Sequence, residues 1–304
     1  MATESSDSGW FGDGTETGAI KGRLFAWACL GATLFGIGMV MILLVYVVMD
    51  AFAIGQPNTA PWLDWGFLTN ATSRFADQAG LYPAIIGSVM MMGVIALSAL
   101  PIGVGAAIYL EEYAPDNKLV RFIEINIGNL AGVPSVVYGL LGLAVFVQIM
   151  NLGMGTVIVG GFTVGLLILP IVIISAQEAL RGVPDSRRQA SFGMGATRWQ
   201  TTKNVVLPEA LPGILTGTIL ALGRAIGETA PLLMIGAAAS VYSPPSGLFD
   251  RFSAMPRQIY AWVGMPQQEF QYGVMAAGVV TLLAVLLLMN ASAILIRNKY
   301  QRES

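Results

Sequence analysis

Histidine is absent from the 304 residues, and cysteine occurs only once, as Cys29. The first absence excludes Ser-His-Asp triads, HExxH zinc sites and haem ligation by imidazole. No lysine follows a glycine, so there is no Gly-Lys-Ser/Thr phosphate loop, and no Gly-x-Ser-x-Gly elbow occurs either. We therefore expect no catalytic residues, no metal and no cofactor, and any energy for work must come from another polypeptide.

Charge is also scarce, at 11% of residues, while 55% are hydrophobic and the mean hydropathy is +0.68. Soluble domains carry about 25% charged residues. Charge-free runs cover residues 24–49, 81–110, 125–177 and 270–296. A membrane-spanning helix needs about 20 apolar residues, so the third run predicts two spans with a turn near residues 151–155. A fifth span begins near Leu211, which makes an all-α membrane protein with six transmembrane helices.

The distribution of lysine and arginine predicts the orientation, because cytoplasmic segments carry an excess of both. With the N-terminus inside, outer loops hold only Arg74, Arg251 and Arg257, and Arg224 lies within the membrane. The other basic residues are all cytoplasmic: Lys21, Arg23, Lys118, Arg121, Arg181, Arg187, Arg188, Arg198, Lys203, Arg297, Lys299 and Arg302. Both termini are therefore expected in the cytoplasm.

These patterns divide the chain into five expected parts. The parts are a disordered tail (1–22), a first transmembrane helix (23–50), an outer loop (51–80), a domain that holds the other five predicted spans (81–297) and a short cytoplasmic tail (298–304). Within the domain, a long basic loop at residues 178–208 follows the third charge-free run, on the cytoplasmic side.

Two charges, Arg224 and Glu228, stand inside the predicted fifth span. Each costs about 2.5–3.5 kcal/mol at the middle of a bilayer. On one continuous helix both share a face with Gly213, Gly217 and Ala221. Small residues mark close helix contacts, and intramembrane charges face protein or water, so this face should point away from lipid.

Two interpretations of this pair remain open. Arg224 and Glu228 are four residues apart and can form a buried structural ion pair. Alternatively, Arg224 contacts an anion, since guanidinium groups suit oxyanions, and Glu228 keeps the site from holding that anion too tightly. Thr229 is the third residue of this candidate site. Pro231 should bend the helix just beyond them.

The basic loop predicts a short protruding helix. Pro184 suits a first helical turn, residues 187–192 continue it, and Gly195 is a natural left-handed stop. A second amphipathic piece, residues 199–207, leads to Pro208 and the fifth span. A small protruding helix suits a groove in a partner protein. The alternative is an ordinary basic loop that follows the positive-inside rule.

This loop resembles the EAA motif of ATP-binding-cassette (ABC) importer permeases. The motif residues fall on Gln189, Ala190, Ser191, Gly195, Val205, Leu207 and Pro208. Gln189 stands where the family has Glu, so a contact that needs a negative charge there is lost. The resemblance implies that these residues dock an ATPase.

Three further stretches resemble phosphate importer permeases, and in particular the A-type (PstA) family. These are GVGAAIYLEEYAP (103–115), LAGVPSVVYGLLGL (130–143) and RAIGETAPLL (224–233). The resemblance implies a type I ABC importer permease (MetI-like) architecture in a prokaryotic plasma membrane. The implied partners are a C-type permease subunit, a cytoplasmic ATPase dimer, an extracellular phosphate-binding protein and the lipid bilayer, without nucleic acid.

The alternatives are a permease for another oxyanion, the C-type paralogue, or a self-contained anion channel or secondary transporter. Pro101 and Pro134 predict either helix breaks beside a transport site or packing kinks. Glu111 and Glu112 are expected only to end the second span. Five aromatic residues of the outer loops predict an interfacial belt or part of a binding-protein dock: Trp62, Trp65, Phe67, Trp262 and Phe270.

Overall fold

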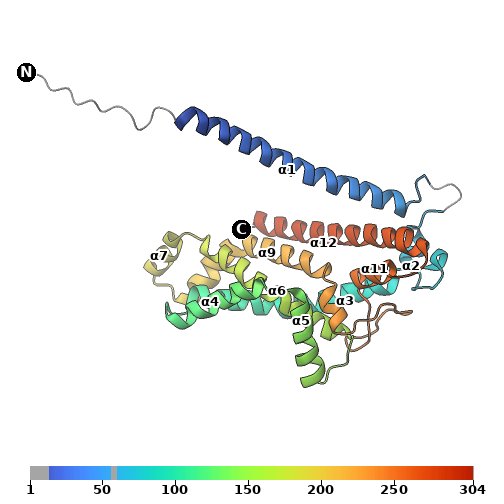
Figure 1. The fold of residues 1–304 in the computed structure, drawn as a ribbon. Helices are drawn as coiled ribbons and strands as arrows, with labels where there is room; N and C mark the ends of the chain where they lie inside the picture. The colour runs from blue at the N-terminus through green and yellow to red at the C-terminus, as the bar shows by residue number, and fades with distance from the viewer. Residues whose placement is uncertain (1–13, 56–59, 304) are drawn as a thin grey trace, which may run out of the picture. The chain divides into compact units, whose positions relative to one another are not determined.

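The computed structural model describes residues 14–55 and 60–303 (Figure 1). The chain divides after Met49 into two compact units. The first unit is formed by helix α1 (Gly14–Ala51). This helix already includes residues 14–22, which the sequence assigned to a disordered tail, and residues 1–13 lie outside the described part.

The second unit contains the remaining helices. They are α2 (Trp65–Thr69), α3 (Tyr82–Ile108), α4 (Lys118–Ala131), α5 (Ser135–Gly142), α6 (Val157–Arg181), α7 (Asp185–Gly193), α8 (Arg198–Thr201), α9 (Leu207–Ile226), α10 (Ala230–Met234), α11 (Met255–Val263) and α12 (Met275–Glu303). Short π-helical turns extend several of them: η2 (Tyr109–Tyr113), η3 (Leu143–Ile149), η4 (Thr202–Val206) and η5 (Phe270–Val274). The only strand-like pairing in the described residues is the isolated bridge between Thr156 and Arg251.

Five helices in the described residues are long and apolar enough to cross a membrane: Lys21–Ala51, Tyr82–Tyr113, Val157–Arg181, Arg198–Ile226 and Phe270–Leu295. Helix α4 and the helix that follows it, Ser135–Ile149, pass the same test only together, bent by 105° at the break between them, and make the sixth span if they count as one. Pro134 occupies the bend with extended backbone, φ −55° and ψ 136°. Because proline has no N–H and cannot continue the helix from Gly132, the helix breaks here, and the break predicted at Pro134 is confirmed.

The predicted fifth span also differs from the structure at both ends. Its helix starts at Arg198, since η4 joins α8 to α9 without a break. The amphipathic piece of the basic loop and the span are therefore one helix. At the other end α9 stops at Ile226, and Gly227 leaves it before Glu228 is reached.

The helices α3, α6, α9 and α12 run side by side through the second unit (Figure 1). Small residues allow the close approaches. A Cβ added at Gly161 of α6 would lie 2.5 Å from Val94 of α3, and one at Gly217 of α9 would lie 2.4 Å from Ser175 of α6. In a membrane such contacts hold helices together without a hydrophobic driving force between them.

The two ends of this helix group differ. Helix α7 and the C-terminal end of α12 lie at one end, and α2 and α11 lie at the other (Figure 1). At the second end Trp262, Phe270 and Phe67 are buried, with the rings of Phe67 and Trp262 5.9 Å apart. The predicted aromatic belt is therefore wrong for these three residues, because they form the packed core of this end; Trp65 is exposed.

A loop between α10 and α11 is ordered by one carboxylate at the same end. Asp250 accepts hydrogen bonds from the hydroxyl and backbone N–H of Ser246 and from the N–H of Gly247, and the Asp250 carbonyl accepts from Val157. The Ser246 hydroxyl and these N–H groups hold the pKa of Asp250 below its usual value.

We expect Gly217→Ala to weaken the packing of α9 on α6, because its Cβ would collide with Ser175. Overpacking of this kind costs about 1–3 kcal/mol of unfolding free energy. Gly223→Ala in the same helix is the control, since its Cβ would meet nothing closer than Asn290 at 3.6 Å. The measurement is the thermal unfolding of the purified protein; equal midpoints for the two variants would contradict the assigned contact.

Candidate functional site

Helix α7 has the form that the sequence predicts. It runs from Asp185 to Gly193 behind Pro184, which stands at the N-cap with extended backbone and not inside the first turn. Gly195 has φ +83°, a left-handed conformation that glycine adopts without steric cost. Its N–H donates to the carbonyl of Phe192 at 2.9 Å, and so terminates the helix.

The surface around α7 combines exposed apolar and polar side chains. Met194 is 88% exposed and Trp199 61%, although both are large and apolar. Gln189 and Ala190 are exposed as well. Large exposed apolar side chains outside the apolar spans are typical of protein contact sites.

The other motif residues have different surroundings. The hydroxyl of Ser191 lies 2.8 Å from that of the buried Thr201, which ties α7 to α8. Val205 and Leu207 are half-buried, and Pro208 is exposed near the start of α9. The structure thus places Gln189, Ala190 and Ser191 on α7 and Gly195 just after its end, while the Val205–Pro208 part of the motif belongs to the fifth span.

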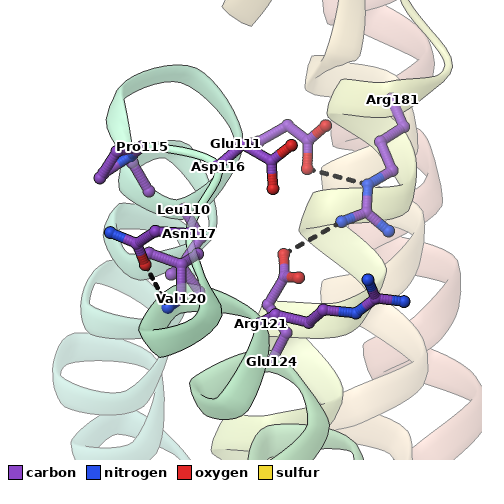
Figure 2. Close-up of a pocket in the computed structure, with 10 residues that line it drawn as sticks. Leu110, Glu111, Pro115, Asp116, Asn117, Val120, Arg121, Glu124 and Arg181 are labelled. Carbon is purple, nitrogen blue, oxygen red and sulfur yellow. Dashed lines mark hydrogen bonds and ion pairs between the residues drawn. The ribbon is translucent and has the colours of Figure 1, made fainter.

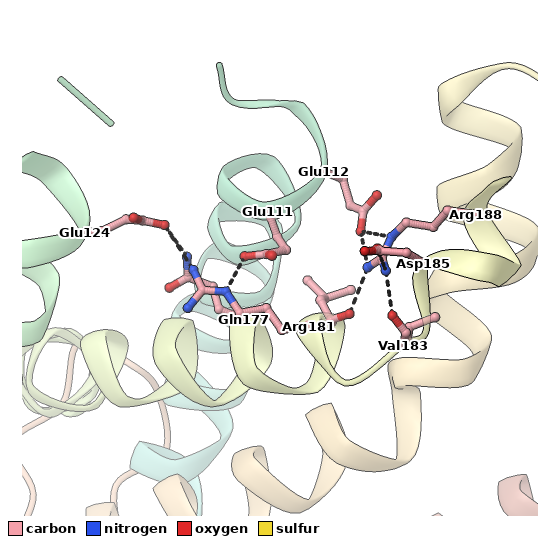
Figure 3. Close-up of polar contacts among 9 residues, drawn as sticks. Glu111, Glu112, Glu124, Gln177, Arg181, Val183, Asp185 and Arg188 are labelled. Carbon is pink, nitrogen blue, oxygen red and sulfur yellow. Dashed lines mark hydrogen bonds and ion pairs between the residues drawn. The ribbon is translucent and has the colours of Figure 1, made fainter. Parts of the chain in front are cut away.

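The Arg188 side chain connects α7 to the rest of the protein (Figure 3). Its Nε and Nη2 donate to Oε1 of Glu112, at 3.3 and 2.9 Å. Its Nη1 donates to the Val183 carbonyl at 2.6 Å and to Asp185 at 3.1 Å, and Nη2 also donates to the Leu180 carbonyl at 2.9 Å. Arg188 therefore joins η2, the end of α6 and the start of α7.

A second arginine joins α6 to two further segments. Arg181 donates from Nε to Glu111 of η2 at 2.9 Å and from Nη2 to Glu124 of α4 at 3.2 Å (Figure 2). Gln177 donates to the same Glu124 oxygen at 3.3 Å. One guanidinium thus joins the C-terminal ends of α3 and α6 to the middle of α4.

A hollow of about 450 Å³ opens beside Arg181 (Figure 2). It is lined by Leu110, Glu111, Ala114, Pro115, Asp116, Asn117, Val120, Arg121, Glu124 and Arg181. Three carboxylates face two guanidinium groups there, so the hollow is unsuited to an anion. Its polar groups hold the helix ends together.

The expectation that Glu111 and Glu112 only end the second span is wrong. Both carboxylates pair with arginines of α6 and α7 across about seventy residues of sequence. No local spacing signals such a contact. The one available hint was the adjacency of two acidic residues on the cytoplasmic side and a basic loop on the same side.

The second candidate site is the pair of charges after α9. Arg224 is in the last turn of α9, and its Nε donates to Oε1 of Glu228 at 3.2 Å. The predicted pair is confirmed, but the single helical face is wrong, because the helix has ended at Ile226. The Arg224 side chain is 47% exposed and that of Glu228 16%, so the guanidinium reaches the surface of the subunit. Thr229 follows as the N-cap of α10.

This break lies close to the bent span. A Cβ added at Gly139 of α5 would lie 2.7 Å from Cα of Pro231, at the start of α10. The close approach needs glycine, and it places the segment after the Pro134 bend against the segment after the Gly227 break. Broken helices that meet inside a membrane protein often border transport sites. Within the described residues no cluster of potential metal ligands occurs.

Comparison with known proteins defines the class. Residues 99–302 match the family described as the binding-protein-dependent transport system inner membrane component. The match covers about two thirds of the chain, which therefore belongs to this family. It is a multi-pass membrane permease subunit.

Two relatives illustrate the similarity. The probable ABC transporter permease protein YqgI of Bacillus subtilis (strain 168) is 35% identical over 204 residues, 67% of this chain and 68% of the relative. The phosphate transport system permease protein PstA 1 of Mycobacterium tuberculosis (strain ATCC 25618 / H37Rv) is 31% identical over 264 residues, 86% of this chain and 82% of the relative.

Solved structures confirm the fold class. A chain of a bacterial alginate ABC transporter, in complex with an alginate-bound periplasmic protein, superposes with a TM-score of 0.63 at 14% identity, covering 92% of this chain and 96% of that one. A chain of the inward-facing MetNI methionine ABC transporter gives 0.55 at 19% identity, covering 72% and 97%. The architecture is that of a MetI-like, type I ABC importer permease.

Proposed function

We propose that this chain is the permease subunit of an ATP-driven importer that moves inorganic phosphate into the cell by alternating access. The observation that carries the proposal is the 31% identity to a phosphate transport permease across 264 residues. A half-exposed guanidinium at a helix break supports it, because Arg224 offers planar donors to a phosphate oxygen.

The transport complex requires further subunits. We assign ATP hydrolysis to a cytoplasmic ATPase dimer, which docks on residues 178–208. A C-type permease completes the pathway as a heterodimer, and an extracellular phosphate-binding protein delivers the cargo. Lysine and arginine distribution favours cytoplasmic termini in a prokaryotic plasma membrane. The C-terminal end of α12 lies at the same end as α7, which supports this orientation for the C-terminus (Figure 1).

Docking on the ATPase is assigned to α7 and the segment that follows it. A short helix with Gln189 and Ala190 exposed, flanked by the apolar Met194 and Trp199, fits a groove on a partner. Gly195 turns the chain sharply after the helix, so we assign α7 and the residues that follow the turn to one partner surface. The residues Ser191, Val205, Leu207 and Pro208 support this surface.

The translocation pathway is assigned to Arg224, Glu228 and Thr229. Loss of the cargo contact would raise the barrier for transfer, whereas the neighbouring carboxylate weakens the hold on the anion and permits release. The 47% exposure of Arg224 leaves donors free for a ligand or for the second permease.

We expect Gly195→Asp to insert normally and to impair ATPase docking. A side chain at φ +83° is strained by about 1–2 kcal/mol, and the carboxylate adds charge to the docking surface. The measurement is co-purification of the ATPase and ATP turnover in the assembled complex. Both should fall sharply.

The control for this variant is Gly264→Asp, which adds the same charge at the opposite end, where φ is −85°. It should retain ATPase association. Normal ATPase docking by Gly195→Asp would contradict the docking assignment and favour an ordinary basic loop at residues 178–208.

The Arg224–Glu228 pair generates a further prediction. Arg224→Gln with Glu228→Gln removes both charges together, which can be nearly neutral for a buried pair. If Arg224 contacts the anion, the double variant assembles but loses a charge-assisted contact of about 1.5–3 kcal/mol. That loss corresponds to roughly ten- to hundredfold slower transfer. The measurement is phosphate uptake per assembled complex, with ATP and binding protein in excess.

A purely structural ion pair gives a different pattern. Each single variant would then harm assembly, and the double variant would recover both assembly and near-normal uptake. That result would remove Arg224 from the pathway.

A further inference from the structure

The Arg188 guanidinium makes as many hydrogen bonds as it has donors. A guanidinium carries five N–H groups, and the five bonds go to Glu112, Val183, Asp185 and Leu180, with Glu112 receiving two. We infer that Arg188 and Glu112 form a rigid joint that makes α7 move with the ends of α3 and α6, and so transmits ATPase motion to the spans. This inference rests on the proposed function.

The joint also binds two carbonyls where the chain turns from α6 toward α7. Arg188 donates to the carbonyl of Leu180, which also accepts from the Val183 N–H at 3.2 Å, and to the carbonyl of Val183, just beyond the end of α6. It also binds Asp185, the acidic first residue of α7. The turn between the two helices is thereby fixed by a side chain of the second helix.

Burial separates this pair from the other ion pairs of α7. The Arg188 and Glu112 side chains are only 17% and 9% exposed, with an N–O distance of 2.9 Å. The neighbouring Arg187 is 63% exposed and lies 3.6 Å from Glu209. Exposed ion pairs contribute little to stability, whereas removing one partner of a buried pair leaves the other charge buried and unpaired.

The elements joined by Arg188 are themselves packed closely. A Cβ added at Gly103 of α3 would lie 2.7 Å from Val172 of α6, and the Gly161 contact joins the same helices farther along. A displacement applied to α7 therefore reaches α3 and α6 as one packed body. Arg181, through Glu111 and Glu124, extends the connection to α4 and the bent span (Figure 3).

Lysine cannot replace Arg188 in this role. It keeps the charge but has three donors at one nitrogen, which cannot reach all four acceptor atoms that Arg188 binds, on Glu112, Leu180, Val183 and Asp185. Arg188→Lys therefore loosens the joint but keeps a positive charge beside Glu112. Glu112→Gln tests the other partner with little change of shape.

The experiment uses the complete complex of both permeases, ATPase and binding protein in liposomes. Phosphate uptake and ATP hydrolysis are measured together, and their ratio gives the phosphate moved per ATP. For Arg188→Lys and Glu112→Gln we expect assembled complexes that still hydrolyse ATP, with the ratio lowered about fivefold or more. The double variant should be no worse than the worse single variant, because both changes break one joint.

Arg121→Lys is the matched control, the same substitution at an exposed arginine of α4, outside the proposed docking segment. Its ratio should stay within about twofold of the wild type. An unchanged ratio in Arg188→Lys and Glu112→Gln would overturn the inference. So would uptake and hydrolysis that fall in proportion, or failure of both variants to assemble, because each result assigns the pair a structural role alone.

The wild-type arm separates the two proposals. If the wild type takes up phosphate in an ATP-dependent way and the variants have a normal ratio of phosphate moved per ATP, the inference about Arg188 and Glu112 is contradicted and the proposed function is kept. Uptake by the wild type that needs no ATP contradicts the proposed function itself, and the joint with it.

Discussion

Hydrogen bonding of the Arg188 guanidinium is the constraint on which the arrangement of α7 depends. A buried guanidinium cannot be left with free donors, and here each donor has an acceptor on η2, α6 or α7. The position of α7, the proposed docking helix, is therefore determined by contacts within the subunit. A helix that is held in this way can transmit a displacement to the helices it is bonded to, whereas a loosely attached one could not.

The spans receive that displacement through contacts of a different kind. Between α3, α6 and α9 the helices touch at glycines, where a single added carbon would collide with a neighbour. Farther along, Gly139 brings the bent span against α10, beside Arg224 and Glu228. Polar pairing at the α7 end and small-residue packing in the spans thus form one continuous set of contacts from the proposed docking helix to the proposed anion site.

The sequence predicted those features of the fold that depend on residues close together in the chain. Charge-free runs marked the spans, Gly195 marked the end of α7, and i,i+4 spacing marked the Arg224–Glu228 pair. The Arg188–Glu112 pair could not be predicted, because its partners are 76 residues apart and only the folded chain brings them together. The end of α9 at Ile226 was missed since an apolar, helix-compatible sequence continues past Gly227, and buried aromatics such as Trp262 look like interfacial ones until their packing is known.

The central claim is that α7, α3 and α6 move as one body during transport. The direct measurement is the distance between spin labels on α7, at Ser186, and on α3, at Ile102, in a complex with Cys29→Ser; both label positions are exposed. Pulsed electron paramagnetic resonance would compare nucleotide-free and ATP-trapped complexes in liposomes. The account predicts one narrow distance distribution, unchanged between the two states. A distribution that shifts between states in a transport-competent complex would contradict it.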